Sequence, residues 1–332
     1  MRCASIDIGT NTLRLLIADV ERGGPLKPIV YKRAITRLGG DYTERTGIDR
    51  ASAERTFAAL EGFKKDIKDN PVETIRAVAT SVVRRARNRD WFLREVTERT
   101  GITPAVITGA EEARMSLLGV LSVIDDTMPK RLVMDIGGGS TEFIATSSNG
   151  TRGAWSMEMG VVHLTEAHIK GDPPDKGEMK ALEAEVGGTV ASLKAMMKND
   201  NIDPSEYTEG VAVFIGTAGT VTTLAAVDQG LEVYDRERIN NYTLTRERVR
   251  TLYEYLTGLT LKERSGVLSL EKGREDLIIP GAAITLAAME AFGFNGLKVI
   301  DAGLLEGVML DGFDRIQSGG SAASPRGGEA CP

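Results

Sequence analysis

The feature that most constrains this chain is a run of three glycines, 137–139, set between two apolar segments. Asp135 stands just before the glycines and Glu142 shortly after them. Consecutive glycines are poor strand residues, so the segment predicts two strands joined by a tight turn with an accessible backbone. The N–H groups of such a turn can approach a phosphate closely, and the two carboxylates suit a divalent cation shared with phosphate oxygens. An ordinary hairpin turn is the alternative.

A second, weaker copy of this unit begins the chain. Asp7 and Gly9 can be laid over Asp135 and Gly137 at a constant offset of 128 positions (135 − 7), and a hydroxyl residue ends both turns. Nothing recurs at shorter periods, so the pattern indicates one internal duplication rather than a solenoid. A chain of 332 residues is long enough for two domains. Two similar α/β domains facing each other across a cleft would place both turns on one ligand.

Helical and extended segments alternate through both halves of the chain. Apolar residues at helical spacing predict a helix over 53–67, with Asp49 as its N-cap, and another over 111–124. Further helices are expected over 88–99, 161–170, 176–198, 245–257 and 275–292, and short strands over 74–80, 104–108, 211–215 and 298–300.

A polar, proline-containing stretch, 125–130, is the expected domain boundary. The expected organisation is a first domain over 1–125, a second over 126–302, a helix over 303–316 that packs back on the first domain, and a disordered tail over 317–332.

Charge and composition disfavour several classes of protein. A formal charge of −6 argues against a nucleic-acid partner held by bulk charge. Only two histidines are present, which disfavours a histidine metal cluster. The N-terminus lacks the apolar core of a signal peptide, and the most apolar window, 277–289, reads as a buried helix too short for a bilayer. Two cysteines near opposite ends imply no disulfide framework, so we expect a cytoplasmic protein without a membrane partner.

Two glycine- and hydroxyl-rich turns with paired carboxylates are parts that phosphoryl-transfer sites use. Such a site positions phosphate and neutralises its charge without needing a covalent nucleophile. No Gly-x-x-x-x-Gly-Lys-Ser/Thr motif occurs, which excludes a P-loop protein. The three glycines lead into a strand rather than a helix, which argues against a dinucleotide-binding turn.

Two motifs together resemble the exopolyphosphatase / guanosine pentaphosphate phosphatase (Ppx/GppA phosphatase) family. They are Asp7-Ile8-Gly9-Thr10-Asn11-Thr12 and Asp135-Ile136-Gly137-Gly138-Gly139-Ser140-Thr141-Glu142. Matching stretches follow in order over roughly residues 1–312: Ala79–Arg84, Thr108–Arg114, Met159–Glu166, Gly216–Thr220 and Leu277–Ala282. The resemblance implies an α/β fold of two duplicated actin-like (ribonuclease H-like) domains with an active-site cleft between them.

The resemblance also implies roles for individual residues. Glu112 aligns with the catalytic glutamate of the family and would act as general base toward water. Asp135 and Glu142 look like the Mg²⁺ pair, or the pair for another divalent cation, with Asp7 as a third candidate. The residues expected to bind phosphate are Thr10, Asn11, Thr12, Arg84, Gly137, Gly138, Gly139 and Ser140.

Two of these assignments also have a purely structural interpretation. Glu111 and Glu112 could form only a favourable acidic first turn of a helix. Their side chains point about 100° apart, so we expect only one to face the site. Arg84 could belong to a solvated basic turn.

The chain departs from the family pattern at three places. Leu305 stands where many members have arginine, His163 replaces a frequent arginine after Gly160, and Asn240-Asn241 occupies a usual His-Gly position. These changes bear on substrate preference more than on the fold. We expect His163 on a helix surface or at an interface rather than in catalysis.

The expected function is Mg²⁺-dependent hydrolysis that releases terminal orthophosphate from inorganic polyphosphate. Guanosine pentaphosphate 5′-phosphohydrolase, with a link to the stringent response, is the main alternative because it breaks the same type of bond. Further alternatives are a phosphotransferase, acting between polyphosphate and ADP or on a small molecule, and a guanosine tetraphosphate sensor with little turnover. The expected partner is polyphosphate or guanosine pentaphosphate, and a homodimer is left open.

Overall fold

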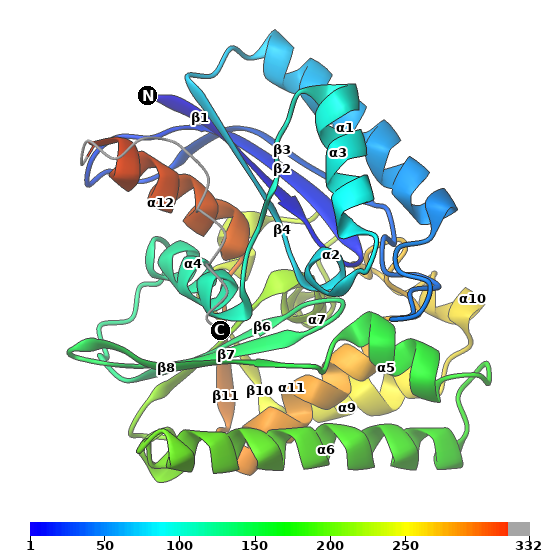
Figure 1. Cartoon of the computed structure of the whole chain (residues 1–332). Helices are drawn as coiled ribbons and strands as arrows, with labels where there is room; N and C mark the ends of the chain where they lie inside the picture. Colours follow the sequence, from blue (N-terminus) through cyan, green and yellow to red (C-terminus); the bar gives the residue numbers. More distant parts are fainter. Residues whose placement is uncertain (318–332) are drawn as a thin grey trace, which may run out of the picture. The chain divides into compact units, whose positions relative to one another are not determined.

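The computed structural model describes residues 1–317. By their contacts they form two compact units: Met1–Thr108 with the C-terminal segment from Leu305, and Gly109–Leu304. Each unit is built on one β-sheet (Figure 1). Residues 318–332, which make up all but the first residue of the expected disordered tail, lie outside the described part of the chain.

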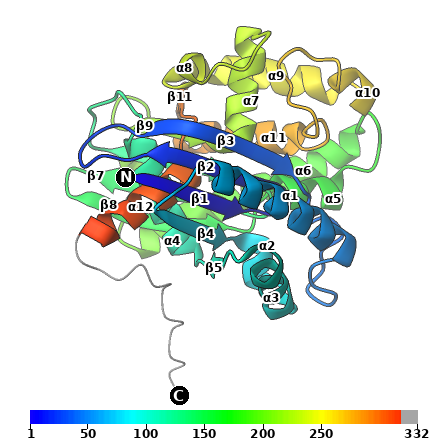
Figure 2. The same cartoon turned by 90° about the horizontal axis from the view of Figure 1, so that it is seen from above.

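The first unit contains a five-stranded sheet in the order β3-β2-β1-β4-β5. Figure 2 shows β3, β2, β1 and β4 side by side. The strands are β1 (Arg2–Ile8), β2 (Thr12–Asp19), β3 (Lys27–Ile35), β4 (Thr74–Ala79) and β5 (Ala105–Val106). The helices are α1 (Arg50–Asp69), α2 (Ser81–Arg85), α3 (Arg89–Thr100) and α12 (Leu304–Gln317), the last beginning one residue before this unit resumes.

The second unit contains a six-stranded sheet in the order β10-β11-β9-β6-β7-β8. Figure 1 shows α4 on one face of this sheet and α6 and α11 on the other. The strands are β6 (Arg131–Ile136), β7 (Thr141–Ser147), β8 (Gly150–Met157), β9 (Val213–Thr217), β10 (Tyr242–Thr245) and β11 (Gly296–Val299). The helices are α4 (Gly109–Leu121), α5 (Val161–His168), α6 (Lys176–Asn199), η1 (Pro204–Glu206, 3-10), α7 (Ala218–Gln229), α8 (Arg236–Ile239), α9 (Arg246–Thr257), α10 (Leu261–Arg264) and α11 (Ile278–Phe292).

The two sheets share one topology. β1, β2 and β3 form an antiparallel meander, and β4 and β5 then run parallel to β1. β6, β7 and β8 repeat the meander, and β9 and β11 take the places of β4 and β5. β10 is added at the edge beside β11. The predicted α/β class with an internal duplication is therefore confirmed.

The helices form where the apolar spacing predicts them. Asp49 caps α1, since its carboxylate accepts the N–H of Ser52 at 3.0 Å, and Phe57 and Leu60 pack into the core of the first sheet. The very apolar α11 is buried in the core of the second unit, as expected. None of the helices within residues 1–317 is long and apolar enough to cross a membrane.

Two helices cover a sheet built from a different part of the chain. α4 follows the last strand of the first sheet, yet its Ala113 and Leu117 pack on Val133 and Ile144 of the second sheet. α12 follows the last strand of the second sheet and packs Met309 against the first. The units therefore divide at 108/109, whereas the sequence placed the boundary at 125/126. An apolar stripe shows that a helix is buried, but it does not show which sheet buries it.

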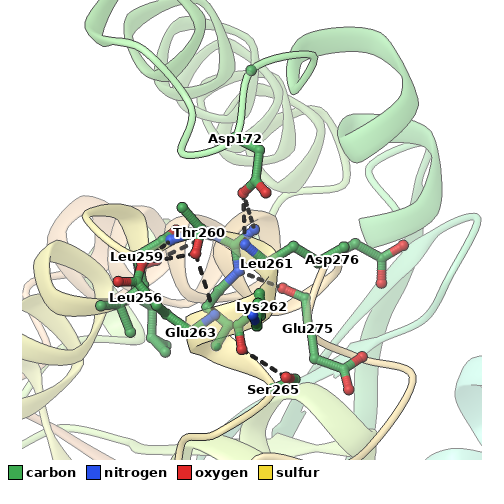
Figure 3. Close-up of polar contacts among 12 residues, drawn as sticks. Asp172, Leu256, Leu259, Thr260, Leu261, Lys262, Glu263, Ser265, Glu275 and Asp276 are labelled. Atoms are coloured by element: carbon green, nitrogen blue, oxygen red, sulfur yellow. Dashed lines mark hydrogen bonds and ion pairs between the residues drawn. The ribbon is translucent and has the colours of Figure 1, made fainter.

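A buried arginine organises the loops around α10. The guanidinium of Arg264 donates to the carbonyl oxygens of Leu259 at 2.6 Å and Glu275 at 2.7 Å. Asp172 lies 3.7 Å away, so one side chain joins three separate loops (Figure 3). Burial lowers the pKa of Arg264, and the nearby carboxylates, Asp172 first, oppose that shift.

Five of the short elements were not expected from the sequence. They are α2, α8, α10, η1 and β10, each of three to five residues. Elements of three to five residues contain little apolar periodicity, so most of them are not recognisable from the sequence.

Candidate active site

Four polar side chains form a row across the sheet of the second unit, next to the glycine turn. Asp135 on β6 pairs directly with Glu142 on β7 and with Thr217 on β9. Glu142 pairs in turn with Ser156 on β8. Directly paired residues of neighbouring strands point to the same face of a sheet. Asp135 and Glu142, only 8% and 2% exposed, are therefore neighbouring buried carboxylates.

Helix α4 runs along this row. At its first residue, a Cβ added to Gly109 would lie 2.7 Å from Cβ of Ser156. Seven residues later, the hydroxyl of Ser116 donates to Oδ2 of Asp135. Seven helical residues rise about 10 Å, which matches the separation of β8 from β6, two strand spacings apart. The helix therefore crosses the strands and stays above the polar row.

This path places Glu112 above the carboxylate pair. Glu112 is one turn before Ser116 on the same helix face and falls at the level of Glu142 on β7. Glu112 is 8% exposed, whereas Glu111 is only half-buried. Glu112 therefore lies on the helix that crosses the strands of Asp135 and Glu142, and it is more buried than Glu111.

The turn after β6 directs its carbonyl groups into the protein. The N–H of Gly137 donates to the carbonyl of Ser140 at 2.9 Å and closes the turn. At the start of α5, Val161 and Val162 donate to the carbonyl oxygens of Gly137 and Gly138 at 3.1 and 2.9 Å. Within residues 1–317 the N–H groups of Gly138 and Gly139 donate to no protein acceptor. Such N–H groups can receive an anion.

The turn of the first unit closes in the same way as the glycine turn of the second unit. The residue opposite its carboxylate is an arginine instead of a second acid. Gly9 donates to the carbonyl of Thr12 at 3.1 Å, as Gly137 does in the second copy. Asp7 lies opposite Arg14, and its Oδ2 accepts from Nη2 and Nε of that arginine at 2.6 and 2.9 Å. The other oxygen of Asp7 and the amide oxygen of Asn11 are buried, and neither accepts a hydrogen bond from any residue within 1–317. Thr10 is also buried.

Arg84 belongs to the first unit. It lies half-buried on α2, and its Nη1 donates to the carbonyl of Ile107 at 2.9 Å. This bond anchors the guanidinium to the protein rather than leaving it in a purely solvated turn.

The three departures from the family pattern have local explanations. Leu305 is fully buried in the apolar core between α12 and the first sheet. Asn241 adopts φ 64°, a left-handed conformation that asparagine tolerates better than most residues and that suits the usual glycine. The side chain of His163 is 58% exposed on α5, in agreement with the expected surface position.

Sequence reasoning missed Ser116, Ser156 and Thr217 as members of the polar row. Ser116 follows Glu112 at i+4 spacing, which was a usable signal for a shared helix face. Ser156 and Thr217 join the row only through strand pairing, which the sequence does not display.

The carboxylates fit a divalent cation such as Mg²⁺. Within residues 1–317 no group of three or more His, Cys, Asp and Glu side chains is arranged to hold a metal ion. Mg²⁺ is commonly held by one or two carboxylates together with phosphate oxygens and water, and a pair such as Asp135 and Glu142 is of that kind. The donor-free buried oxygen of Asp7 is the kind of atom that a cation or bound water satisfies.

Comparison with known proteins identifies the family. The model of the Ppx/GppA phosphatase family matches residues 16–316. Exopolyphosphatase 2 of Mycobacterium tuberculosis is 31% identical over 325 residues, which cover 93% of this chain and 98% of that protein. A guanosine-5′-triphosphate,3′-diphosphate pyrophosphatase of Aliivibrio fischeri is 29% identical and is covered over 60% of its length.

A bifunctional 3-dehydroquinate synthase/phosphatase of Fusobacterium nucleatum is 32% identical over 94% of this chain, which spans 46% of that protein. Among solved structures, the Ppx/GppA family member of Aquifex aeolicus is 32% identical with a TM-score of 0.77, over 97% of this chain and 99% of that one. These matches confirm the predicted family and enzyme class. The chain belongs to the Ppx/GppA phosphatase family.

Proposed function

We propose that this chain hydrolyses the terminal phosphoanhydride of inorganic polyphosphate and releases orthophosphate, with Glu112 as general base and Mg²⁺ or another divalent cation as cofactor. The observation that supports the proposal is the path of α4, which carries buried Glu112 and crosses the strands that hold Asp135 and Glu142. A base and an acidic cation site on one polar band are what hydrolysis of a phosphoanhydride requires.

Each group in the second unit has a distinct task. The N–H groups of Gly138 and Gly139, with Gly137 and Ser140 shaping the turn, bind oxygens of the terminal phosphate. Asp135 and Glu142 hold the cation, which supplies positive charge against the phosphate oxygens when bound. The remaining task, activation of water, falls to Glu112.

Glu112 takes one proton from a water molecule while the water oxygen attacks the terminal phosphorus. The bond from that phosphorus to the bridging oxygen breaks, and the shortened polyphosphate leaves with the electron pair. No covalent enzyme intermediate is needed, because positioning and charge neutralisation lower the barrier.

Residues of the first unit are also proposed to bind phosphate. Thr10, Asn11 and Thr12 belong to a turn with the geometry of the glycine turn, and Arg84 offers a planar guanidinium suited to phosphate oxygens. Asp7 remains a third candidate ligand for the cation, supported by its donor-free buried oxygen.

We propose polyphosphate rather than guanosine pentaphosphate as the substrate because the chain covers more of the length of its exopolyphosphatase relative. Exopolyphosphatase 2 is covered over 98% of its length, whereas the guanosine-5′-triphosphate,3′-diphosphate pyrophosphatase is covered over 60%. A cytoplasmic location without nucleic-acid or membrane partners completes the proposal.

A phosphate-release assay with Mg²⁺ tests the function. It compares polyphosphates of several lengths, guanosine pentaphosphate, and ATP with and without candidate acceptors. Release of orthophosphate from polyphosphate is the expected result. Release from guanosine pentaphosphate alone would replace the substrate, and turnover of ATP only with an acceptor would replace hydrolysis by phosphotransfer.

A further inference from the structure

Two serine hydroxyls hold the carboxylate pair of the second unit from different elements. Oγ of Ser116, on α4, donates to Oδ2 of Asp135. Oγ of Ser156, on β8, donates to Oε1 of Glu142 at 2.6 Å. Each hydroxyl therefore engages one oxygen of one carboxylate.

Like charges paired directly across two strands repel each other, and Asp135 and Glu142 are both buried. A hydroxyl donor orients a carboxylate without neutralising it. In the first unit the equivalent carboxylate, Asp7, forms an ion pair with the guanidinium of Arg14. The serines act on the second pair through hydrogen bonds alone.

The surroundings keep both hydroxyls in place. Ser116 is fully buried, and a Cβ added to Gly303 would lie 3.5 Å from its Oγ and 3.7 Å from Oδ2 of Asp135. Gly109 leaves just enough room for Ser156, since a Cβ there would lie 2.7 Å from Cβ of the serine. Small residues thus line both serine–carboxylate contacts.

We propose that Ser116 and Ser156 are positioning residues that set the orientation of Asp135 and Glu142 and thereby the affinity of the divalent-cation site. The inference rests on the proposed function only in assigning a divalent cation to this pair. Partners that orient metal-binding carboxylates typically contribute about 10- to 100-fold in metal affinity or activity.

Direct binding of Mn²⁺, used as a probe for Mg²⁺, tests the inference on the full chain without substrate. Isothermal titration calorimetry should show about 10-fold weaker Mn²⁺ binding in Ser116→Ala and in Ser156→Ala. Ser156→Thr keeps the hydroxyl and should bind Mn²⁺ as the wild type does.

Matched controls separate positioning from general damage. Ser122→Ala removes a hydroxyl that bonds only locally to the carbonyl of Gly119 at 2.7 Å, and Thr151→Ala alters an exposed position on β8. Both controls should bind Mn²⁺ like the wild type. Circular dichroism in the presence of EDTA should show that all variants are folded. Ser156 is exposed, so its variants still test the inference if Ser116→Ala unfolds.

Activity measured against Mg²⁺ concentration supplies a second readout. The alanine variants should need more Mg²⁺ for half-maximal rate and recover most of their kcat at saturation. Unchanged Mn²⁺ affinity in both alanine variants, or no Mn²⁺ binding by the wild type, would overturn the inference. A wild type that binds Mn²⁺ but releases no phosphate from polyphosphate would refute the proposed function alone, provided the variants still bind more weakly.

Discussion

Asp135 and Glu142 lie directly opposite each other on adjacent antiparallel strands, and the same two positions of the first unit hold Asp7 and Arg14. The duplicated hairpins thus share backbone geometry, but the first has an acidic and a basic residue at these positions and the second has two acidic residues. In the first copy an ion pair neutralises the carboxylate. In the second copy two carboxylates face each other.

The carboxylate pair should destabilise the protein when no divalent cation is bound. Opposed like charges cost up to about 1 kcal/mol, so Glu142→Gln should raise the melting temperature in EDTA by about 2 °C. The same variant should lose the stabilisation that Mg²⁺ confers on the wild type. Differential scanning fluorimetry with EDTA and with excess Mg²⁺ measures both effects. Glu232→Gln, at an exposed position of the same unit, is the control; equal Mg²⁺ shifts in all three proteins would contradict the assignment.

The ion pair of the first unit should contribute to stability. The side chains of Asp7 and Arg14 are 4% and 22% exposed, so Arg14→Met leaves a buried charge without this partner. We expect a loss of about 3 kcal/mol in the free energy of unfolding. Adding Asp7→Asn should recover part of that loss, as measured by urea unfolding of the single and double variants. Strictly additive costs would show that the two side chains do not interact.

Glu112 and its neighbour allow a matched test of the general base. Glu112→Gln should lower kcat by about 10²- to 10⁴-fold and leave Mn²⁺ binding intact, since the side chain would lose proton transfer but keep its shape. Glu111→Gln, which changes a half-buried residue of the same turn, should have little effect. Phosphate-release kinetics decide the matter, and near-normal rates for Glu112→Gln would remove it from the mechanism.

The glycine turn at 137–139 should be sensitive to substitution of Gly160, the residue just before α5. A Cβ at position 160 would lie 2.3 Å from the carbonyl oxygen of Gly138, so Gly160→Ala must displace the turn. We expect a loss of about 1–3 kcal/mol in stability and a higher KM for the phosphate substrate. Gly187→Ala is the matched control, because an added Cβ there meets no atom within 4 Å and should stabilise α6 by about 0.5–1 kcal/mol. An unchanged KM in Gly160→Ala would separate the turn from substrate binding.

Arg264 should matter for stability rather than for activity. Its side chain is 3% exposed, and lysine cannot reach the separate carbonyls of Leu259 and Glu275 in the same way. Arg264→Lys should cost about 2 kcal/mol in the free energy of unfolding. Arg250→Lys, which changes an exposed ion pair with Glu290, should cost less than about 1 kcal/mol. Equal costs in chemical denaturation would show that burial of the guanidinium is unimportant.

The sequence was informative wherever the determining interactions are local. The order of the carboxylate, glycine turn and following strand predicted both hairpins, and the constant offset between Asp7 and Asp135 predicted the shared topology. Glycine conformational freedom and strand alternation act over a few neighbouring residues, so they are visible in the chain itself. The site assignments of Glu112, Asp135 and Glu142 came from the family resemblance; the structure pairs Asp135 with Glu142 and packs α4, which carries Glu112, on their sheet.

Tertiary structure alone decided which helix covers which sheet. The apolar stripe of α4 was recognised, yet nothing local showed that it would pack on Val133 and Ile144 instead of the strands that precede it. For the same reason Ser116 and Ser156 escaped notice, because their contacts with the carboxylates depend on helix placement and strand register. Residues distant in sequence become neighbours only when two surfaces pack, and that choice is a property of the whole fold.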